Sequence, residues 1–179
     1  DGVYNVFSGA VSPEKTEQFF NLYILPYFKS PAVSKDLVCP YESDLPKQCT
    51  PFKFANNSTV TISVLTQLNY GRIYFTTSDK TSYFINIMKY IDPDNPEDGR
   101  EYRTSPEVWV DLNGADGPNT MGKDIFYFKT DFSKGLVMSY CASNSYEYIN
   151  RDCSKDGYGF CCAAKIMLDG WKIKDDYPW

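Results

Sequence analysis

Residues 70–91 read YGRIYFTTSDKTSYFINIMKYI, and this stretch decides the predicted fold. It contains two runs, residues 70–77 and 81–91, that are rich in the aromatic and β-branched residues favoured in strands. Residues 78–80, Ser-Asp-Lys, separate the runs and are typical of a hairpin turn. The stretch therefore predicts two antiparallel strands joined by a short turn.

Further strand-like runs lie on both sides of this hairpin. Residues 58–69 alternate between apolar side chains and small polar ones, which is the pattern of a half-buried strand. Residues 107–111, 125–130 and 135–141 are three more short runs of strand-forming residues. Together with the hairpin they predict a meandering antiparallel sheet.

A helix is predicted ahead of the sheet, over residues 12–29. Ser12 is a suitable N-cap and Pro13 suits the first helical position, whereas Pro26 removes a backbone donor and predicts a kink or an end near Leu25. Apolar side chains recur every four positions: Phe20, Ile24 and Phe28. This apolar stripe is expected to cover the sheet. The predicted fold class is therefore α+β, an N-terminal amphipathic helix on an antiparallel sheet, in a single domain over residues 1–179.

The other segments give weaker signals. Residues 30–57 hold four prolines and predict a long loop, and residues 142–160 are polar and contain Gly157 and Gly159. Residues 163–168 favour a short helix that Gly170 would end, with a strand as the alternative.

The composition excludes several classes of function. The 179 residues include 18 Lys and Arg against 23 Asp and Glu, a net charge of −5, which argues against nucleic acid or an anionic membrane surface as the main partner. The chain has no His, so Ser-His-Asp and Cys-His catalysis and His-ligated metal sites are excluded. No stretch approaches the 18 apolar residues of a membrane-spanning helix.

The cysteine count predicts disulfides and hence a periplasmic or extracellular location. There are six: Cys39, Cys49, Cys141, Cys153, Cys161 and Cys162. Cys39 and Cys49 are expected to pair locally. The adjacent Cys161 and Cys162 are expected to take different partners, Cys141 and Cys153, in an order that the sequence leaves open. Reduced core cysteines are the alternative interpretation.

The densest polar stretch is residues 111–124, which lie between two predicted strands. Its carboxylate and amide side chains are Asp111, Asn113, Asp116, Asn119 and Asp124, and it holds three glycines. Several hard oxygens on a loop that can fold back are what calcium requires, although the spacing departs from that of an EF-hand. The alternative is a tight loop in which Asp and Asn cap their own backbone.

Three separated blocks resemble one known family. Residues 19–27 read FFNLYILPY, residues 111–126 read DLNGADGPNTMGKDIF, and residues 161–173 read CCAAKIMLDGWKI. Together they resemble the globular domains of bacterial type IV pilin-like proteins, including the pseudopilins of type II secretion systems. The resemblance implies a calcium-binding loop whose candidate ligands are Asp111, Asn113, Asp116 and Asp124.

The resemblance also implies a function without catalysis. The chain is expected to be the soluble globular domain of a structural filament subunit, a minor pilin or pseudopilin. Its partners would be other pilin or pseudopilin subunits. An apolar helix ahead of residue 1 would anchor the intact protein in the inner membrane before assembly, and the assembled domain would lie in the periplasm or at the cell surface.

Two rival functions follow from other residues. A pilus-tip adhesin would contact surfaces or glycans through exposed tyrosines, for which the candidates are Tyr140, Tyr146, Tyr148 and Tyr158. A secreted carboxylate-dependent hydrolase would need two acids with separated pKa values, and the sequence singles out no such pair.

Overall fold

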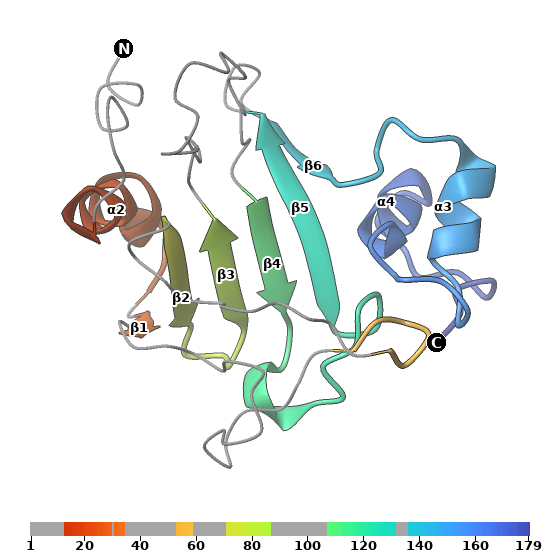
Figure 1. The fold of residues 1–179 in the computed structure, drawn as a ribbon, viewed down its shortest axis with the longest axis horizontal. Coiled ribbons are helices and arrows are strands. Elements are labelled where there is room, and N and C mark those ends of the chain that lie inside the picture. The colour runs from red at the N-terminus through yellow and green to blue at the C-terminus, as the bar shows by residue number, and fades with distance from the viewer. Residues whose placement is uncertain (1–12, 30, 35–52, 59–70, 87–106, 132–135) are drawn as a thin grey trace, which may run out of the picture.

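A computed structural model describes residues 13–29, 31–34, 53–58, 71–86, 107–131 and 136–179. Its centre is an antiparallel sheet of six strands that lie in the order in which they follow along the chain (Figure 1). The strands are β1 (Ala32–Ser34), β2 (Arg72–Thr76), β3 (Ser82–Asn86), β4 (Glu107–Asp111), β5 (Ile125–Asp131) and β6 (Leu136–Ser139). Helices lie beside this sheet, so the α+β class is confirmed.

The predicted hairpin is present as β2 and β3. Phe75 lies opposite Tyr83 in the antiparallel register, and the turn is closed by hydrogen bonds from Thr77 N to Thr81 O and from Lys80 N to Thr77 O, both 2.9 Å. Both strands are shorter than their sequence runs. Tyr70 and residues 87–91 lie outside the described part of the chain.

The remaining strand predictions have mixed outcomes. Strands β4, β5 and β6 lie where residues 107–111, 125–130 and 135–141 predict them. Strand β1 corrects the prediction of a loop over residues 30–57, because backbone pairing with β2 makes a strand of a short segment that has little periodicity. The predicted strand 58–69 falls outside the described residues, except for Ser58.

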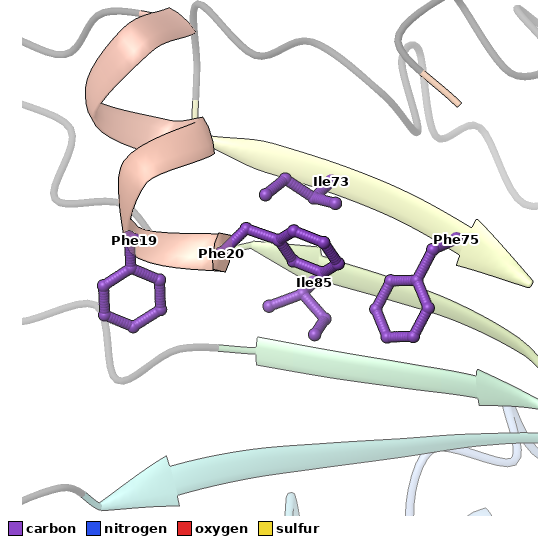
Figure 2. Close-up of a cluster of buried hydrophobic side chains, with 5 residues drawn as sticks. All are labelled: Phe19, Phe20, Ile73, Phe75 and Ile85. Atoms are coloured by element: carbon purple, nitrogen blue, oxygen red, sulfur yellow. The ribbon is translucent and has the colours of Figure 1, made fainter. Parts of the chain in front are cut away.

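The N-terminal helical segment packs against one face of the sheet. It consists of α2 (Pro13–Phe19), a π-helical turn η1 (Phe20–Ile24) and a 3₁₀ turn η2 (Leu25–Tyr27). The chain becomes extended at Phe28, directly after the turn that contains Pro26. Figure 2 shows the Phe20 ring among three apolar side chains of the sheet, and it lies 5.2 Å from the Phe75 ring between centroids.

Two further helices lie at the other end of the sheet (Figure 1). Helix α4 (Cys162–Leu168) contacts α3 (Tyr146–Asp152), β5 and β6, and it confirms the helical alternative for that segment. Helix α3 lies in the polar residues 142–160, to which sequence analysis assigned no element. Its signal is the N-cap Ser145, whose Oγ accepts a hydrogen bond from Tyr148 N.

Two disulfides hold this C-terminal region together. Cys141 pairs with Cys161, and Cys153 pairs with Cys162. The prediction that the adjacent cysteines take different partners is confirmed, and the structure decides their order. The predicted pair Cys39–Cys49 lies outside the described residues. The two disulfides agree with an oxidising, periplasmic or extracellular location.

The opposite face of the sheet carries a row of aromatic side chains. Tyr74, Phe84, Trp109 and Tyr127 are direct cross-strand neighbours on β2 to β5, and Phe160 packs against this row from the C-terminal region. Such pairs stabilise a sheet because the rings meet across adjacent strands. Among the described residues, no helix combines the length and the apolar character needed to cross a bilayer.

Candidate functional site

The candidate site is the loop between β4 and β5. Asp111 is the last residue of β4 and lies opposite Ile125, the first residue of β5. Leu112 N donates a hydrogen bond of 2.9 Å to Asp124 O, which closes the base of the loop. The two acids predicted to bracket the loop therefore do so, and both are buried, with 2% of Asp111 and 6% of Asp124 exposed.

The Asp111 carboxylate organises the first half of the loop. Its Oδ1 accepts hydrogen bonds from Asn113 N at 3.2 Å and from Gly114 N at 2.9 Å. Burial raises the pKa of Asp111 to about 6, and the nearby charge of Asp124 contributes to this rise, whereas the two backbone amides oppose it. The Asp111 carboxylate is thus buried, and the two backbone hydrogen bonds from its own loop compensate only part of the cost of its charge.

The Asp124 carboxylate organises the second half of the loop. Its Oδ2 accepts from Asn119 N at 2.8 Å, and its Oδ1 accepts from Thr120 N at 2.6 Å. The same segment is held from outside by Lys53, whose N donates to Asn119 O at 2.9 Å and whose O accepts from Met121 N at 2.8 Å. Both halves of the loop therefore fold around a buried carboxylate.

Two amide oxygens in this loop have no recorded hydrogen-bond partner. They are Asn113 Oδ1 and Asn119 Oδ1, both buried, and no donor in the described part of the chain reaches them. The other end of the Asn113 amide is satisfied, because its Nδ2 donates to Gly117 O at 2.7 Å. Buried acceptors without a donor are costly, so each of these oxygens is available for a ligand.

Asp116 has a different environment from the other candidates. Its Oδ2 lies 2.8 Å from Lys80 Nζ in a surface ion pair, which connects the loop to the β2–β3 turn. Gly114 makes the close approach of these two turns feasible. Its φ is +59°, and a Cβ there would lie 2.8 Å from Lys80 O.

The loop is also attached to the C-terminal region. The Tyr177 hydroxyl is buried and donates a hydrogen bond to Gly122 O. Gly122 lies against the Cys153–Cys162 disulfide, since a Cβ at this position would overlap Cys162 Sγ. Sequence reasoning missed Tyr177, because a single tyrosine near the chain end carries no local signal of its partner.

The arrangement offers calcium two carboxylates and two amide oxygens. Asp111, Asp124, Asn113 and Asn119 are hard oxygen donors on one loop, which is the donor chemistry that calcium prefers. The amide hydrogen bonds do not exhaust the carboxylates, since each carboxylate has about four lone-pair sites. No group of three or more Asp, Glu, Cys or His side chains that could hold a metal occurs among the described residues, so amide and backbone oxygens would have to complete the shell.

The four tyrosines of the adhesin hypothesis all lie at the surface. Their exposed fractions run from 40% to 54%: Tyr140, Tyr146, Tyr148 and Tyr158. Cations lie over three of the rings. Lys129 Nζ is 4.7 Å from the Tyr140 centroid, Arg151 Cζ is 5.2 Å from the Tyr148 centroid, and Lys165 Nζ is 5.3 Å from the Tyr146 centroid.

Comparison with known proteins adds no further assignment. No family model, curated protein or solved structure matches this chain.

Proposed function

We propose that the chain is the globular domain of a filament subunit, a minor pilin or pseudopilin of a type IV pilus or a type II secretion filament. The observation that carries this proposal is the packing of the N-terminal helical segment on the sheet, with Phe20 against Phe75. A helix held in this way transmits force directly to the sheet, which a filament subunit requires.

The C-terminal region supports the same function. The block at residues 111–126 meets the block at residues 161–173 where Gly122 lies against the Cys153–Cys162 disulfide, and Tyr177, which follows the last block, donates its hydroxyl to Gly122 O. A domain cross-linked in this way resists unfolding outside the cell. The proposed work is mechanical and uses surfaces, with other pilin or pseudopilin subunits as partners.

We further propose that the intact protein is anchored in the inner membrane by an apolar helix ahead of residue 1. The test is to sequence the gene upstream of the codon for Asp1, where about 20 apolar codons behind a prepilin-peptidase site are expected. Filaments sheared from the cells are then probed with an antibody against the 179-residue domain. An upstream region without an apolar helix, or filaments that lack the chain, would overturn the proposal.

Calcium belongs to this proposal as a structural ligand of the loop between β4 and β5. Asp111 and Asp124 would supply the charges, and the unpartnered oxygens of Asn113 and Asn119 would supply neutral donors. A bound cation would relieve the repulsion between the two buried carboxylates and hold the base of the loop closed.

A second candidate is an adhesive subunit. The observation in its favour is the exposure of Tyr140 and Tyr158, whose rings both pack on Phe160 beside the aromatic row of the sheet. The test compares the binding of the wild-type domain and of Tyr140→Ala and Tyr158→Ala variants to a glycan array and to host cells. Specific binding that the variants lose would favour the adhesin over a purely structural subunit.

A further inference from the structure

The second half of the loop between β4 and β5, residues 119–124, lies in direct contact with the C-terminal region. Gly122 and Gly159 have φ values of +82° and +85°. A Cβ on Gly159 would lie 2.5 Å from Met121 O, and a Cβ on Gly122 would overlap Cys162 Sγ. Neither glycine could carry a side chain without displacing its neighbour. The loop backbone therefore packs closely on the C-terminal region at two successive residues.

The Cys153–Cys162 disulfide lies at this contact. Its two cysteines are buried and form one cluster with Tyr177, and Phe126 of β5 packs against that cluster. The Tyr177 hydroxyl donates a hydrogen bond to Gly122 O. The same cluster thus holds Gly122 in two ways, by packing and by a hydrogen bond.

The position of Gly122 determines that of the Asp124 carboxylate. Gly122 N donates a hydrogen bond of 2.8 Å to Ile125 O, which closes the turn that contains Asp124. The Asp124 carboxylate then accepts hydrogen bonds from Asn119 N and Thr120 N. A shift of Gly122 would therefore move both Asp124 and Asn119, two of the proposed calcium ligands.

A second connection runs from Asn119 to the same region. Lys53 N donates to Asn119 O at 2.9 Å, and Ala55 N, two residues along, donates to Tyr158 O at 3.2 Å. Tyr158 lies within the span that the Cys153–Cys162 disulfide closes. This disulfide is thus connected to both ends of residues 119–124.

The Cys141–Cys161 disulfide lies in a different cluster. Its cysteines pack with Ile149 of α3 and Ala164 of α4. Among the residues that the structure describes, no member of this cluster belongs to the loop between β4 and β5. The two disulfides therefore differ in their contact with the proposed calcium site.

The loop needs support from outside because its ligand groups are costly to hold together. Asp111 and Asp124 are buried carboxylates whose charges repel each other. Asn113 Oδ1 and Asn119 Oδ1 are buried acceptors without a recorded donor in the described part of the chain. Contacts that offset these costs hold the oxygens in place before a cation binds, and such preorganisation raises affinity.

We propose that the Cys153–Cys162 disulfide and the Tyr177 hydroxyl position the calcium loop, so that the affinity of the loop for calcium depends on both. The inference rests on the calcium site proposed above and not on the filament function. Both groups act through Gly122 and not by contact with the cation. Groups outside the coordinating shell commonly change metal affinity by roughly 10- to 100-fold. By linkage, calcium should strengthen the attachment of the C-terminal region by the same factor.

Calcium titration of the 179-residue chain by isothermal calorimetry tests the proposal. The double variant Cys153→Ala/Cys162→Ala should bind calcium roughly tenfold or more weakly than the wild type. The matched control Cys141→Ala/Cys161→Ala should change the affinity by at most about threefold, because its cluster does not include the loop. Circular dichroism checks that each variant is folded. Equal losses of affinity in the two variants, or no loss in the first, would overturn the proposal.

A single hydroxyl provides the milder test, because it leaves both disulfides intact. Tyr177→Phe should weaken calcium binding roughly fivefold. Tyr27→Phe, at a tyrosine that is 84% exposed on the N-terminal helical segment, should leave the affinity unchanged. A hydroxyl with a merely structural role would lower the stability of the calcium-free domain without changing the affinity of the folded domain for calcium.

The titrations also separate this inference from the calcium site on which it rests. A wild type that binds no calcium would overturn both. A wild type that binds calcium no more tightly than Tyr177→Phe would overturn the inference alone and leave the calcium site in place.

Discussion

Tyr177 donates its hydroxyl to the carbonyl oxygen of Gly122, a residue 55 positions earlier in the chain. This buried hydrogen bond joins the last residues of the chain to the loop between β4 and β5. The Tyr177 ring also packs with the Cys153–Cys162 disulfide. One side chain thereby connects the candidate cation loop, a disulfide and the segment that follows α4.

Removal of this hydroxyl should be costly for its size. Tyr177→Phe keeps the ring but leaves Gly122 O without its donor, so we expect a loss of about 1–3 kcal/mol in the free energy of unfolding. Chemical denaturation measures it. Tyr158→Phe, at an exposed tyrosine with no recorded hydroxyl hydrogen bond to the described residues, is the control and should change stability by less than about 0.5 kcal/mol. Equal losses of unfolding free energy in the two variants would show that the hydrogen bond from Tyr177 to Gly122 O does not add to stability.

Phe20 should be the most sensitive position of the helical segment. It is 3% exposed and packs on Ile73, Phe75 and Ile85, so Phe20→Ala should cost about 3–5 kcal/mol through lost burial and the resulting cavity. The measurement is the free energy of unfolding in urea. Leu22→Ala, two positions along and more than half exposed, serves as the control. If Phe20→Ala is as stable as the wild type, the helical segment does not contribute to the core, and the filament proposal loses its main support.

Calcium should stabilise the domain through the loop between β4 and β5. A cation that binds only the folded state adds RT ln(1 + [L]/Kd), or about 2.7 kcal/mol at a hundredfold excess over Kd. Thermal melting in calcium and then in chelator measures the effect. Asp111→Asn keeps an oxygen that can accept from Asn113 N and Gly114 N but loses the charge, so it should abolish the calcium response.

The control for the calcium response is Asp156→Asn, at an exposed acid outside the loop, which should keep the full shift in melting temperature. If the wild type melts at the same temperature in calcium and in chelator, the loop does not bind calcium and is a turn that hydrogen bonds to its own carboxylates close.

The two described disulfides should each contribute to stability. The Cys141–Cys161 and Cys153–Cys162 pairs span 20 and 9 residues, for which the loop-closure entropy amounts to roughly 3 kcal/mol each. Replacing both cysteines of one pair by Ala should lower the unfolding free energy by about that amount. Peptide mapping without reduction should recover these two linkages, and Cys39 linked to Cys49 as the sequence predicts. Cross-pairing of Cys141 with Cys162 would contradict the structure.

Asp152 should impose a pH dependence that a neutral variant lacks. Burial raises its pKa above the ordinary 3.8, and the 2.7 Å hydrogen bond from Cys161 N offsets only part of this rise. The folded state then binds the proton more tightly than the unfolded state. The contribution of this group to stability is therefore greatest below pH 3.8 and declines as the pH rises through the folded-state pKa.

Asp152→Asn keeps an acceptor for Cys161 N and cannot ionise. Its stability relative to the wild type should therefore increase between about pH 3 and pH 7, as measured by denaturant titrations across that range. A relative stability of Asp152→Asn that is constant or falls with pH would show that the Asp152 pKa is not raised.

Local chemistry accounts for the features that the sequence alone determined. Strand-forming runs and turn residues predict the β2–β3 hairpin and the positions of β4 and β5. A glycine with positive φ, Gly170, predicts where α4 ends. The acids that close the loop, Asp111 and Asp124, also follow, because they stand where two predicted strands end and begin. Each of these signals acts over a few neighbouring residues.

Contacts between distant residues account for what only the tertiary structure decided. Three contacts join segments that are remote in sequence: the Cys141–Cys161 disulfide, the pairing of β1 with β2, and the hydrogen bond from Tyr177 to Gly122 O. The burial of Asn119 Oδ1 also depends on the folded structure. Helix α3 is a short helix on a polar stretch that packs against α4. Apart from the N-cap of α3, none of these features has a local pattern, because its energy is realised only when the partner segment has already been placed by the rest of the fold.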